Sequence, residues 1–244
     1  MAIKFVYPYM QSLAQGDELK NSIRSICKHV KFDFDIVLLG DSPKWYNGLH
    51  IPTDQVRGMR FAKCFDITNK LLHLFESDIV EDEFIYMYDD IYMISDVSMD
   101  DFRKIVAMEK YEPGRKVKGA SANWQALFDN TFGELSLPLM YNYETHLPRL
   151  LKKSWLRLIV KSYNLYKKPM LFNTLYFNEF YDKPDVVLTE LNEIKAGVYK
   201  VMTTDQIEKL CTGKKFLNHS ENTYNDKMVR FLNDRFKEKS KFEV

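Results

Sequence analysis

The first hundred residues alternate between short apolar runs and amphipathic stretches. The apolar runs are Ile3 to Tyr7, Phe34 to Leu39 and Phe84 to Tyr88. A strand that is apolar on both faces must be buried on both faces, which is typical of parallel sheets covered by helices. Between these runs, Asp17 to Val30 and Arg60 to Glu76 place apolar residues at helical spacing. This β-α-β-α-β order predicts an α/β fold with a mostly parallel central sheet, flanked by helices, and a ligand site beyond the carboxyl ends of the strands.

The pattern after Asp101 is less regular, and its clearest elements are helices. Pro148 is expected to open one, because proline is favoured at a first helical position and the apolar residues that follow share a face. Further helices are predicted at Thr203 to Leu210 and Tyr224 to Phe236, with a short strand at Lys215 to Leu217. The other face of the Pro148 helix would carry the largest basic cluster of the chain, namely Arg149, Lys152, Lys153, Arg157 and Lys161.

Charge and cysteine content exclude several classes of protein. The chain has 35 Lys and Arg against 34 Asp and Glu, so no long-range field would draw it onto nucleic acid or an anionic membrane. Cys27, Cys64 and Cys211 lack CxxC spacing, which argues against a disulfide framework and favours a reducing cytoplasm. The N-terminus does not look like a signal peptide, and no window reaches the roughly eighteen apolar residues of a membrane span. We therefore expect a soluble, cytoplasmic protein.

The strongest single motif is Tyr88-Asp89-Asp90 at the end of a buried apolar strand. Successive side chains of a strand point to opposite faces, so one acid can face a ligand crevice while the other supports it. Carboxylate oxygens suit Mg²⁺ or Mn²⁺, and such an ion can bridge a diphosphate. The alternative is that both acids lie in a solvated turn, and the spacing alone leaves the two interpretations balanced.

Two histidines are candidates for chemistry. His219 follows a short apolar run, so it is either an Mn²⁺ ligand or a buried structural group, and the isolated signal favours the second. His146 precedes the predicted basic helix near Arg149, where it could meet a phosphate, act as a base toward an acceptor hydroxyl, or cap the helix.

Basic residues near the third element form a possible anion clamp. Arg60 and Lys63 begin the predicted helix, and Asn69 follows two turns later. The competing explanation is a solvated helix start, which is the more frequent situation for such residues. No GxxxxGK[ST], GxGxxG, HExxH or GxSxG motif is present, which removes the common phosphate-loop, dinucleotide, zinc-protease and hydrolase interpretations.

Four segments carry motifs in a recognisable order. Glu18 to Trp45 contains a helix ending in Ser-Ile-x-Lys-His, a strand and a turn ending in Pro-x-Trp, and Phe84 to Ile94 contains the paired acids. Thr145 to Ser154 contains a histidine block, and Phe216 to Glu243 ends in Ser-x-Phe-Glu. Together these segments, about half the chain, resemble the Stealth family of sugar-phosphate transferases, which includes bacterial capsular polysaccharide phosphotransferases and N-acetylglucosamine-1-phosphotransferase.

The resemblance implies a GT-A-like glycosyltransferase core with a C-terminal helical annex. It implies a single transferase domain over residues 1–244, with a nucleotide-binding half at 1–105 and an acceptor-side, helical half at 106–244. The opening Thr-Trp-Val-x-Gly block of the family has no counterpart in Phe5 to Gln11, and Tyr88 replaces an asparagine. These departures touch the donor site and favour glycosyl transfer over sugar-1-phosphate transfer.

The resulting hypothesis is a metal-dependent transferase that moves a sugar from a nucleotide-sugar, with UDP favoured, to an acceptor hydroxyl. The acceptor would be a saccharide, with a modified nucleic-acid base as a second option. Alternatives are a sugar-1-phosphate transferase and a non-catalytic sugar- or nucleotide-binding module. The candidate residues are His146 and Asp89 for catalysis, Asp90, Asp89 and His219 for Mn²⁺ or Mg²⁺, and Arg60, Lys63, Asn69, Arg149 and Asn218 for the donor.

Overall fold

A computed structural model of the chain describes residues 2–117, 119–181 and 191–244. Its central sheet has five strands in the order β3-β2-β1-β4-β8. β1 pairs in parallel with both β2 and β4, β3 pairs in parallel with β2, and β8 pairs antiparallel with β4. The prediction of a mostly parallel sheet is therefore confirmed. The strands are β1 (Ile3–Tyr9), β2 (Phe34–Gly40), β3 (Leu49–Pro52), β4 (Glu83–Tyr86) and β8 (Arg149–Lys152).

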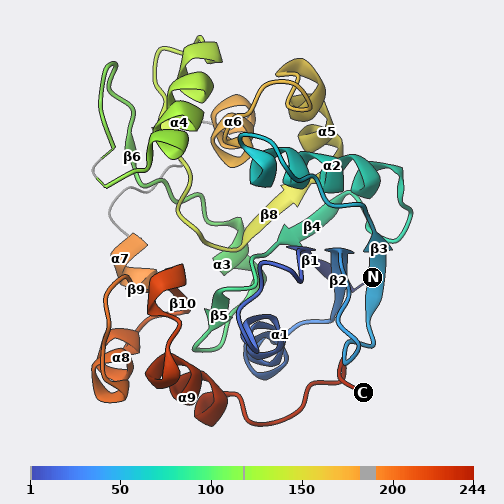
Figure 1. The fold of residues 1–244 in the computed structure, drawn as a ribbon, viewed down its shortest axis with the longest axis vertical. Helices are drawn as coiled ribbons and strands as arrows, with labels where there is room; N and C mark the ends of the chain where they lie inside the picture. Colours follow the sequence, from blue (N-terminus) through green and yellow to red (C-terminus); the bar gives the residue numbers. More distant parts are fainter. Residues whose placement is uncertain (1, 118, 182–190) are drawn as a thin grey trace.

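Helices cover both faces of this sheet, as Figure 1 shows. Alternate residues of each strand enter different cores: Phe5 packs with the residues of α1, whereas Val6 packs with those of α2. Because the central positions of β1, β2 and β4 are apolar and buried on both sides, both faces can be covered at once. The helices over one face are α1 (Glu18–His29) and α3 (Met99–Arg103), and those over the other are α2 (Ala62–Glu76), α4 (Ala122–Glu134), α5 (Lys153–Ser162) and α6 (Phe172–Phe180).

A second, smaller sheet lies beside the first. It has the order β5-β10-β9, in which β10 pairs antiparallel with β5 and parallel with β9. The predicted C-terminal annex is therefore a sheet with helices, and the description of it as helical is incomplete. Its elements are β5 (Ile91–Met93), β9 (Lys195–Val198), β10 (Phe216–His219), α7 (Leu191–Ile194), α8 (Thr204–Cys211), the 3-10 turn η2 (Glu221–Thr223) and α9 (Asp226–Arg235).

Each of the two predicted halves of the chain contributes a strand that pairs with a strand of the other half. β5 belongs to the first half but pairs with β10, and β8 belongs to the second half but pairs with β4. A short antiparallel pair, β6 (Glu109–Lys110) with β7 (Tyr141–Asn142), lies in the connection between them. Residues 1–105 and 106–244 are thus interlocked at both sheets.

The prediction that Pro148 opens a helix is wrong. Arg149–Lys152 is β8, and α5 begins only at Lys153. Leu151 enters the core that contains α2, whereas Leu150 packs against the core that contains α1, which is the alternation of a strand. Adjacent leucines fit a helical and an extended pattern equally well, and pairing with β4 decides between them.

Among the described helices, none is long and apolar enough to cross a bilayer.

Candidate functional site

Asp89 and Asp90 lie where the chain leaves the central sheet for the second one. β4 ends at Tyr86, and the amide of Met87 still bonds the carbonyl of Val6 on β1 at 2.9 Å. β5 then begins at Ile91 in the other sheet. The paired acids therefore occupy the carboxyl end of a central strand, at the junction of the two sheets. This is the location at which open α/β sheets bind their ligands.

The pKa values of the two carboxylates are shifted in opposite directions. Burial, together with the charge of Asp90, raises the pKa of Asp89 to about 6. Burial also acts to raise the pKa of Asp90, but the charge and hydrogen bond of His146 more than offset it, so this pKa lies below its ordinary value. Asp90 is thus held ionised, and Asp89 retains an unfavourable interaction with its neighbour that a bound cation would relieve.

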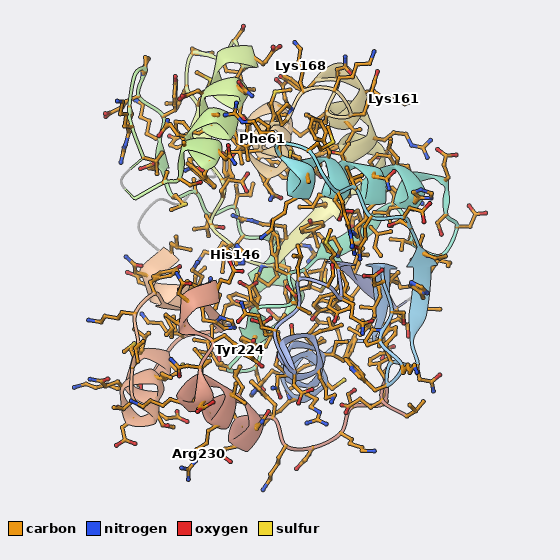
Figure 2. All side chains as sticks on the ribbon, viewed as in Figure 1. Phe61, His146, Lys161, Lys168, Tyr224 and Arg230 are labelled. Carbon is orange, nitrogen blue, oxygen red and sulfur yellow. The ribbon has the colours of Figure 1, made fainter. Side chains whose placement is uncertain are left out.

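His146 pairs with Asp90 from the opposite side of the junction. Its Nε2 lies 2.8 Å from Oδ1 and 3.0 Å from Oδ2 of Asp90. The ring stacks on Tyr88 with centroids 4.4 Å apart, and the side chain remains 38% exposed. Figure 2 labels His146 near the middle of the molecule, between the helices over the central sheet and the second sheet. Because an ionised carboxylate only accepts, Nε2 donates in this pair, and in the neutral imidazole Nδ1 is then the acceptor.

The backbone of His146 is strained, with φ of +52°. Non-glycine residues seldom adopt this left-handed conformation and need support from their surroundings. Lys195 Nζ donates to the carbonyl of Thr145 at 2.7 Å. Arg149 donates to the carbonyls of Val106 at 2.9 Å and Tyr143 at 3.2 Å, and also to Thr145 Oγ1. Two buried cations therefore fix the segment that presents His146.

Burial also shifts the pKa values of the ionisable groups around the His146 segment. It lowers the pKa of Lys195 to about 8 and that of Arg149 to about 10. Glu144, next to this segment, accepts hydrogen bonds from the amide and hydroxyl of Thr174, each at 3.1 Å, and its pKa is raised by burial. Arg149 is only 3% exposed, so the structure places it in the interior, whereas the sequence suggested an exposed phosphate contact.

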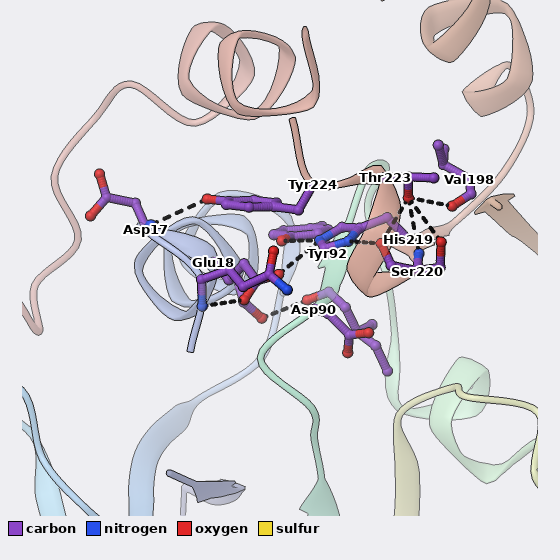
Figure 3. A network of polar contacts seen from close by, with 12 residues as sticks. Asp17, Glu18, Asp90, Tyr92, Val198, His219, Ser220, Thr223 and Tyr224 are labelled. Atoms are coloured by element: carbon purple, nitrogen blue, oxygen red, sulfur yellow. Dashed lines mark hydrogen bonds and ion pairs between the residues drawn. The ribbon is translucent and has the colours of Figure 1, made fainter. Parts of the chain in front are cut away.

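His219 is enclosed on the second sheet, as Figure 3 shows. Its side chain is 1% exposed and lies between the rings of Tyr92, at 5.8 Å, and Tyr224, at 5.1 Å. Nε2 lies 3.0 Å from the hydroxyl of Tyr92, and Nδ1 lies 3.2 Å from the carbonyl of Ser220. Both ring nitrogens are thus already in hydrogen bonds.

Glu18, at the start of α1, reaches the same histidine. Its Oε1 lies 3.4 Å from Nε2 of His219. Burial raises the pKa of Glu18 to about 8 and lowers that of His219, so each group favours its neutral form. The contact is therefore between neutral groups at pH 7 and contributes less than a charged pair would.

Two cavities meet at these residues. One, of about 350 Å³, lies at the ends of β1 and β4, and the other, of about 750 Å³, lies over β9 and β10. Asp90, His146, His219 and Glu221 line both. A third cavity of about 650 Å³ lies between α1 and the C-terminal segment, and no predicted site residue lines it. The smaller cavity is completed by Pro8, Met10, Leu13, Gln15, Glu18, Lys63, Asp66, Ile67, Tyr88 and Asp89.

The predicted donor residues are scattered. Lys63 lines the smaller cavity, and Asn218 lines the larger one. Arg60 is exposed and donates to Asn123 Oδ1 at 3.2 Å, while Asn69 donates to the carbonyl of Asp54 at 3.0 Å. Asn69 lines a separate cavity beneath Tyr166. Lys63 is thus the only predicted donor contact on the cavity that contains Asp89.

The predicted metal ligands fit a cation in part. Over residues 2–117, 119–181 and 191–244, no three His, Cys, Asp or Glu side chains group closely enough to hold a metal ion. The adjacent carboxylates of Asp89 and Asp90 supply the oxygen donors and the excess negative charge that a hard cation prefers. Ligation through Nε2 of His219 would have to replace its bond to Tyr92. Asp89 and Asp90 therefore fit, while ligation by His219 stays a prediction.

Several residues of the site escaped sequence reasoning. Lys195 begins β9, a strand that the sequence did not reveal, Tyr199 follows its last residue, and Glu18 looked like an ordinary acid in a first helical turn. Glu144 stood two residues from His146, which is the one signal that could have identified it.

Comparison with known structures concerns the fold. Over 98% of its length the chain superposes on a structure described as the bifunctional glycosyltransferase WbbM, with a TM-score of 0.51 and 10% identity. It matches the glycosyltransferase GlyE of Streptococcus pneumoniae TIGR4 with a TM-score of 0.44 and 13% identity over its full length. A glycosyltransferase involved in glycosylation of the major capsid of PBCV-1 matches 98% of the chain, and all of that protein, with a TM-score of 0.44 and 10% identity.

The chain spans 50% of the WbbM chain and 66% of the GlyE chain. The likeness to WbbM concerns the fold alone, and the other two scores are too low to add to it. No protein-family model matches the chain, so the Stealth resemblance stays a prediction. No curated protein matches its sequence.

Proposed function

We propose that the chain is a glycosyltransferase that moves a sugar from a nucleotide-sugar to an acceptor hydroxyl. The observation that carries this proposal is the Asp90–His146 pair at the junction of two cavities. A transferase needs a donor and an acceptor on opposite sides of its reacting groups, and a pair shared by both cavities meets that requirement. The glycosyltransferase fold supports the assignment without determining the reaction.

The donor is assigned to the smaller cavity and the acceptor to the larger one. The smaller cavity lies at the carboxyl ends of β1 and β4, where α/β sheets bind nucleotides. Lys63 lines this cavity and would supply positive charge to a phosphate. UDP-sugars are the favoured donor class, following the resemblance noted in the sequence.

His146 is the proposed general base. With Nε2 bonded to Asp90, Nδ1 is free to accept the proton of the acceptor hydroxyl. The acceptor oxygen then bonds to C1 of the donor sugar, the bond from C1 to the phosphate oxygen breaks, and its electron pair leaves with the nucleoside diphosphate. Asp90 orients the imidazole and stabilises the imidazolium that forms, as the carboxylate of a catalytic triad does.

Mn²⁺ or Mg²⁺ completes the proposal. Asp89 and Asp90 would hold the ion, and it would neutralise charge on the departing diphosphate. Burial and, after it, the charge of Asp90 raise the pKa of Asp89, and a bound cation would relieve the repulsion between the two carboxylates.

The test is the nucleotide that the protein releases. Purified protein is incubated with UDP-glucose, UDP-galactose and UDP-N-acetylglucosamine, with and without Mn²⁺, and nucleotides are separated by chromatography. We expect UDP, released in the presence of Mn²⁺ and lost in Asp90→Asn. Release of UMP would instead identify a sugar-1-phosphate transferase. Binding of nucleotide without release of either product, in the presence of simple saccharide acceptors, would identify a non-catalytic module.

A further inference from the structure

The floor of the larger cavity is one face of β9. Lys195, Gly197 and Tyr199 alternate along this segment and all line the cavity. The intervening residues Ala196 and Val198 are at most 1% exposed and pack under α8 and α9. This alternation is that of a strand with one apolar and one open face. The open face ends in an aromatic ring.

Tyr199 presents this ring to solvent. The residue is 63% exposed, although it lies within a cavity and belongs to a type that is usually covered. The hydroxyl donates to Asn218 Oδ1 at 3.4 Å, and the Lys195 ammonium lies 5.9 Å from the ring centroid. The ring is therefore held through its hydroxyl and by Lys195 over one face, and 63% exposure leaves the rest of the ring accessible.

Gly197 is the residue that allows the ring to lie there. A Cβ at this position would stand 2.4 to 2.7 Å from two ring carbons and the hydroxyl oxygen of Tyr199. The backbone of Gly197 is not in the left-handed region, so what a side chain at this position would disturb is the place of the Tyr199 ring and not the backbone conformation. The absence of a side chain at Gly197 thus leaves room for the Tyr199 ring to pack against the strand.

The charges around the ring favour a neutral ligand. Lys195 and Lys214 are the basic residues that line the cavity, whereas Asp90, Glu144 and Glu221 are acidic. Asn192 and Asn218 add amide groups that donate and accept hydrogen bonds. A flat apolar surface with convergent polar groups suits a sugar ring, whose C–H face meets the negative face of an aromatic ring while its hydroxyls meet the amides.

We infer that Tyr199, seated on Gly197, is the stacking platform for a pyranose ring of a neutral saccharide acceptor. This inference rests on the proposed function, because it assigns the larger cavity to the acceptor. Stacking of a nucleic-acid base on the same ring is the competing possibility, and a cavity without excess positive charge does not favour it.

The experiment measures binding without requiring transfer. Saturation-transfer NMR and titration are carried out on wild-type protein with methyl glycosides of glucose, galactose, mannose, N-acetylglucosamine, rhamnose and fucose, and with a single-stranded oligonucleotide. Tyr199→Ala removes the platform, and Gly197→Ala displaces it. Tyr199→Phe keeps the ring. Tyr166→Ala removes a tyrosine that is 51% exposed outside this cavity and serves as the matched control.

We expect at least one glycoside to bind the wild type and both alanine variants in the cavity to weaken it about tenfold. Tyr199→Phe and Tyr166→Ala should bind as the wild type does, and melting temperatures should show that all variants fold. Glycoside affinity unchanged in Tyr199→Ala, no binding of any glycoside, or a loss confined to the oligonucleotide would each overturn the inference. UDP binding, measured on the same samples, tests the proposed function separately.

Discussion

His146 and His219 both act to lower the pKa of Asp90, but one is partly exposed and the other is enclosed. His146 is partly exposed, has a strained backbone and leaves one ring nitrogen without a hydrogen bond in the described part of the chain. His219 is enclosed by two tyrosines and uses both ring nitrogens. A proton acceptor needs a free lone pair and access to substrate, which the first environment provides. The second environment provides stability.

The two environments also bury different ionisable groups. Lys195 supports the His146 segment, and Glu18 contacts His219. Burial moves the pKa of each to about 8, downward for the amine and upward for the acid. Lys195 and Glu18 are therefore both buried ionisable groups whose charged forms are unfavourable, and they lie on different sides of Asp90.

The largest expected effect is at the residue that both environments share. Asp90→Asn removes the charge that orients His146 and that a hard cation requires, while it preserves the shape of the side chain. We expect UDP release from the UDP-sugars to fall by at least about a hundredfold. Asp96→Asn, in which the replaced acid bonds His29 on the surface, is the control and should retain full activity. Equal activity of the two variants would remove Asp90 from the reaction.

The second prediction separates the histidines by turnover. His146→Ala should lower turnover by roughly a hundred- to ten-thousandfold, because a general base acts mainly in the transition state. Donor affinity, measured by calorimetric titration with UDP, should stay close to that of the wild type. The melting temperature should also change little, since the side chain is 38% exposed. A wild-type rate would reduce His146 to a structural residue of its segment.

The third prediction is the converse. His219→Ala leaves a void between Tyr92 and Tyr224 and removes two hydrogen bonds. We expect the free energy of unfolding, measured by urea denaturation, to fall by about 3 kcal/mol. If His219 is a metal ligand instead, stability should hold while the Mn²⁺ concentration needed for activity rises. Measuring both quantities on one preparation decides between these roles.

The sequence predicted this fold where local pattern and burial agree. The runs at Phe34 to Leu39 and Phe84 to Tyr88 could be assigned because consecutive apolar residues, from Ile36 in the first run and from Phe84 in the second, are typical of a doubly covered strand. β8 could not be assigned, because Leu150 and Leu151 fit either pattern and only contact with β4 selects the strand. β9 gave no signal, since Lys195 and Gly197 face a cavity that does not exist until the second sheet forms.

Site residues, too, could be placed from the sequence only where a local pattern fixes their position. Asp89 and Asp90 could be placed at the sheet junction because they follow a strand whose position is encoded locally. Arg149 was misplaced because its partners, the carbonyls of Val106 and Tyr143, come from irregular segments that no periodicity describes. Pairing of His146 with Asp90 joins residues 56 positions apart, a separation that only the folded chain resolves.

The smallest predicted effect concerns Lys195 and stability. Its pKa is about 8 in the folded protein, lowered by burial, against 10.5 for an ordinary lysine. Between these values the unfolded chain binds more protons than the folded one, so the contribution of Lys195 to stability increases as pH rises. Asp90 acts to raise this pKa and Arg149 to lower it, and neither reverses the effect of burial.

Lys195→Met keeps the apolar length of the side chain and removes the titration. Relative to this variant, the wild type should gain up to about 1.4 kcal/mol of unfolding free energy per pH unit between pH 8 and pH 10. Urea denaturation at pH 7.5, 8.5 and 9.5 measures the difference, and comparison with the variant cancels the titration of buried tyrosines. A constant difference would mean that Lys195 is solvated. The support of the His146 segment would then rest on Arg149, whose pKa of about 10 keeps it charged at pH 7.5 and 8.5 and largely so at pH 9.5.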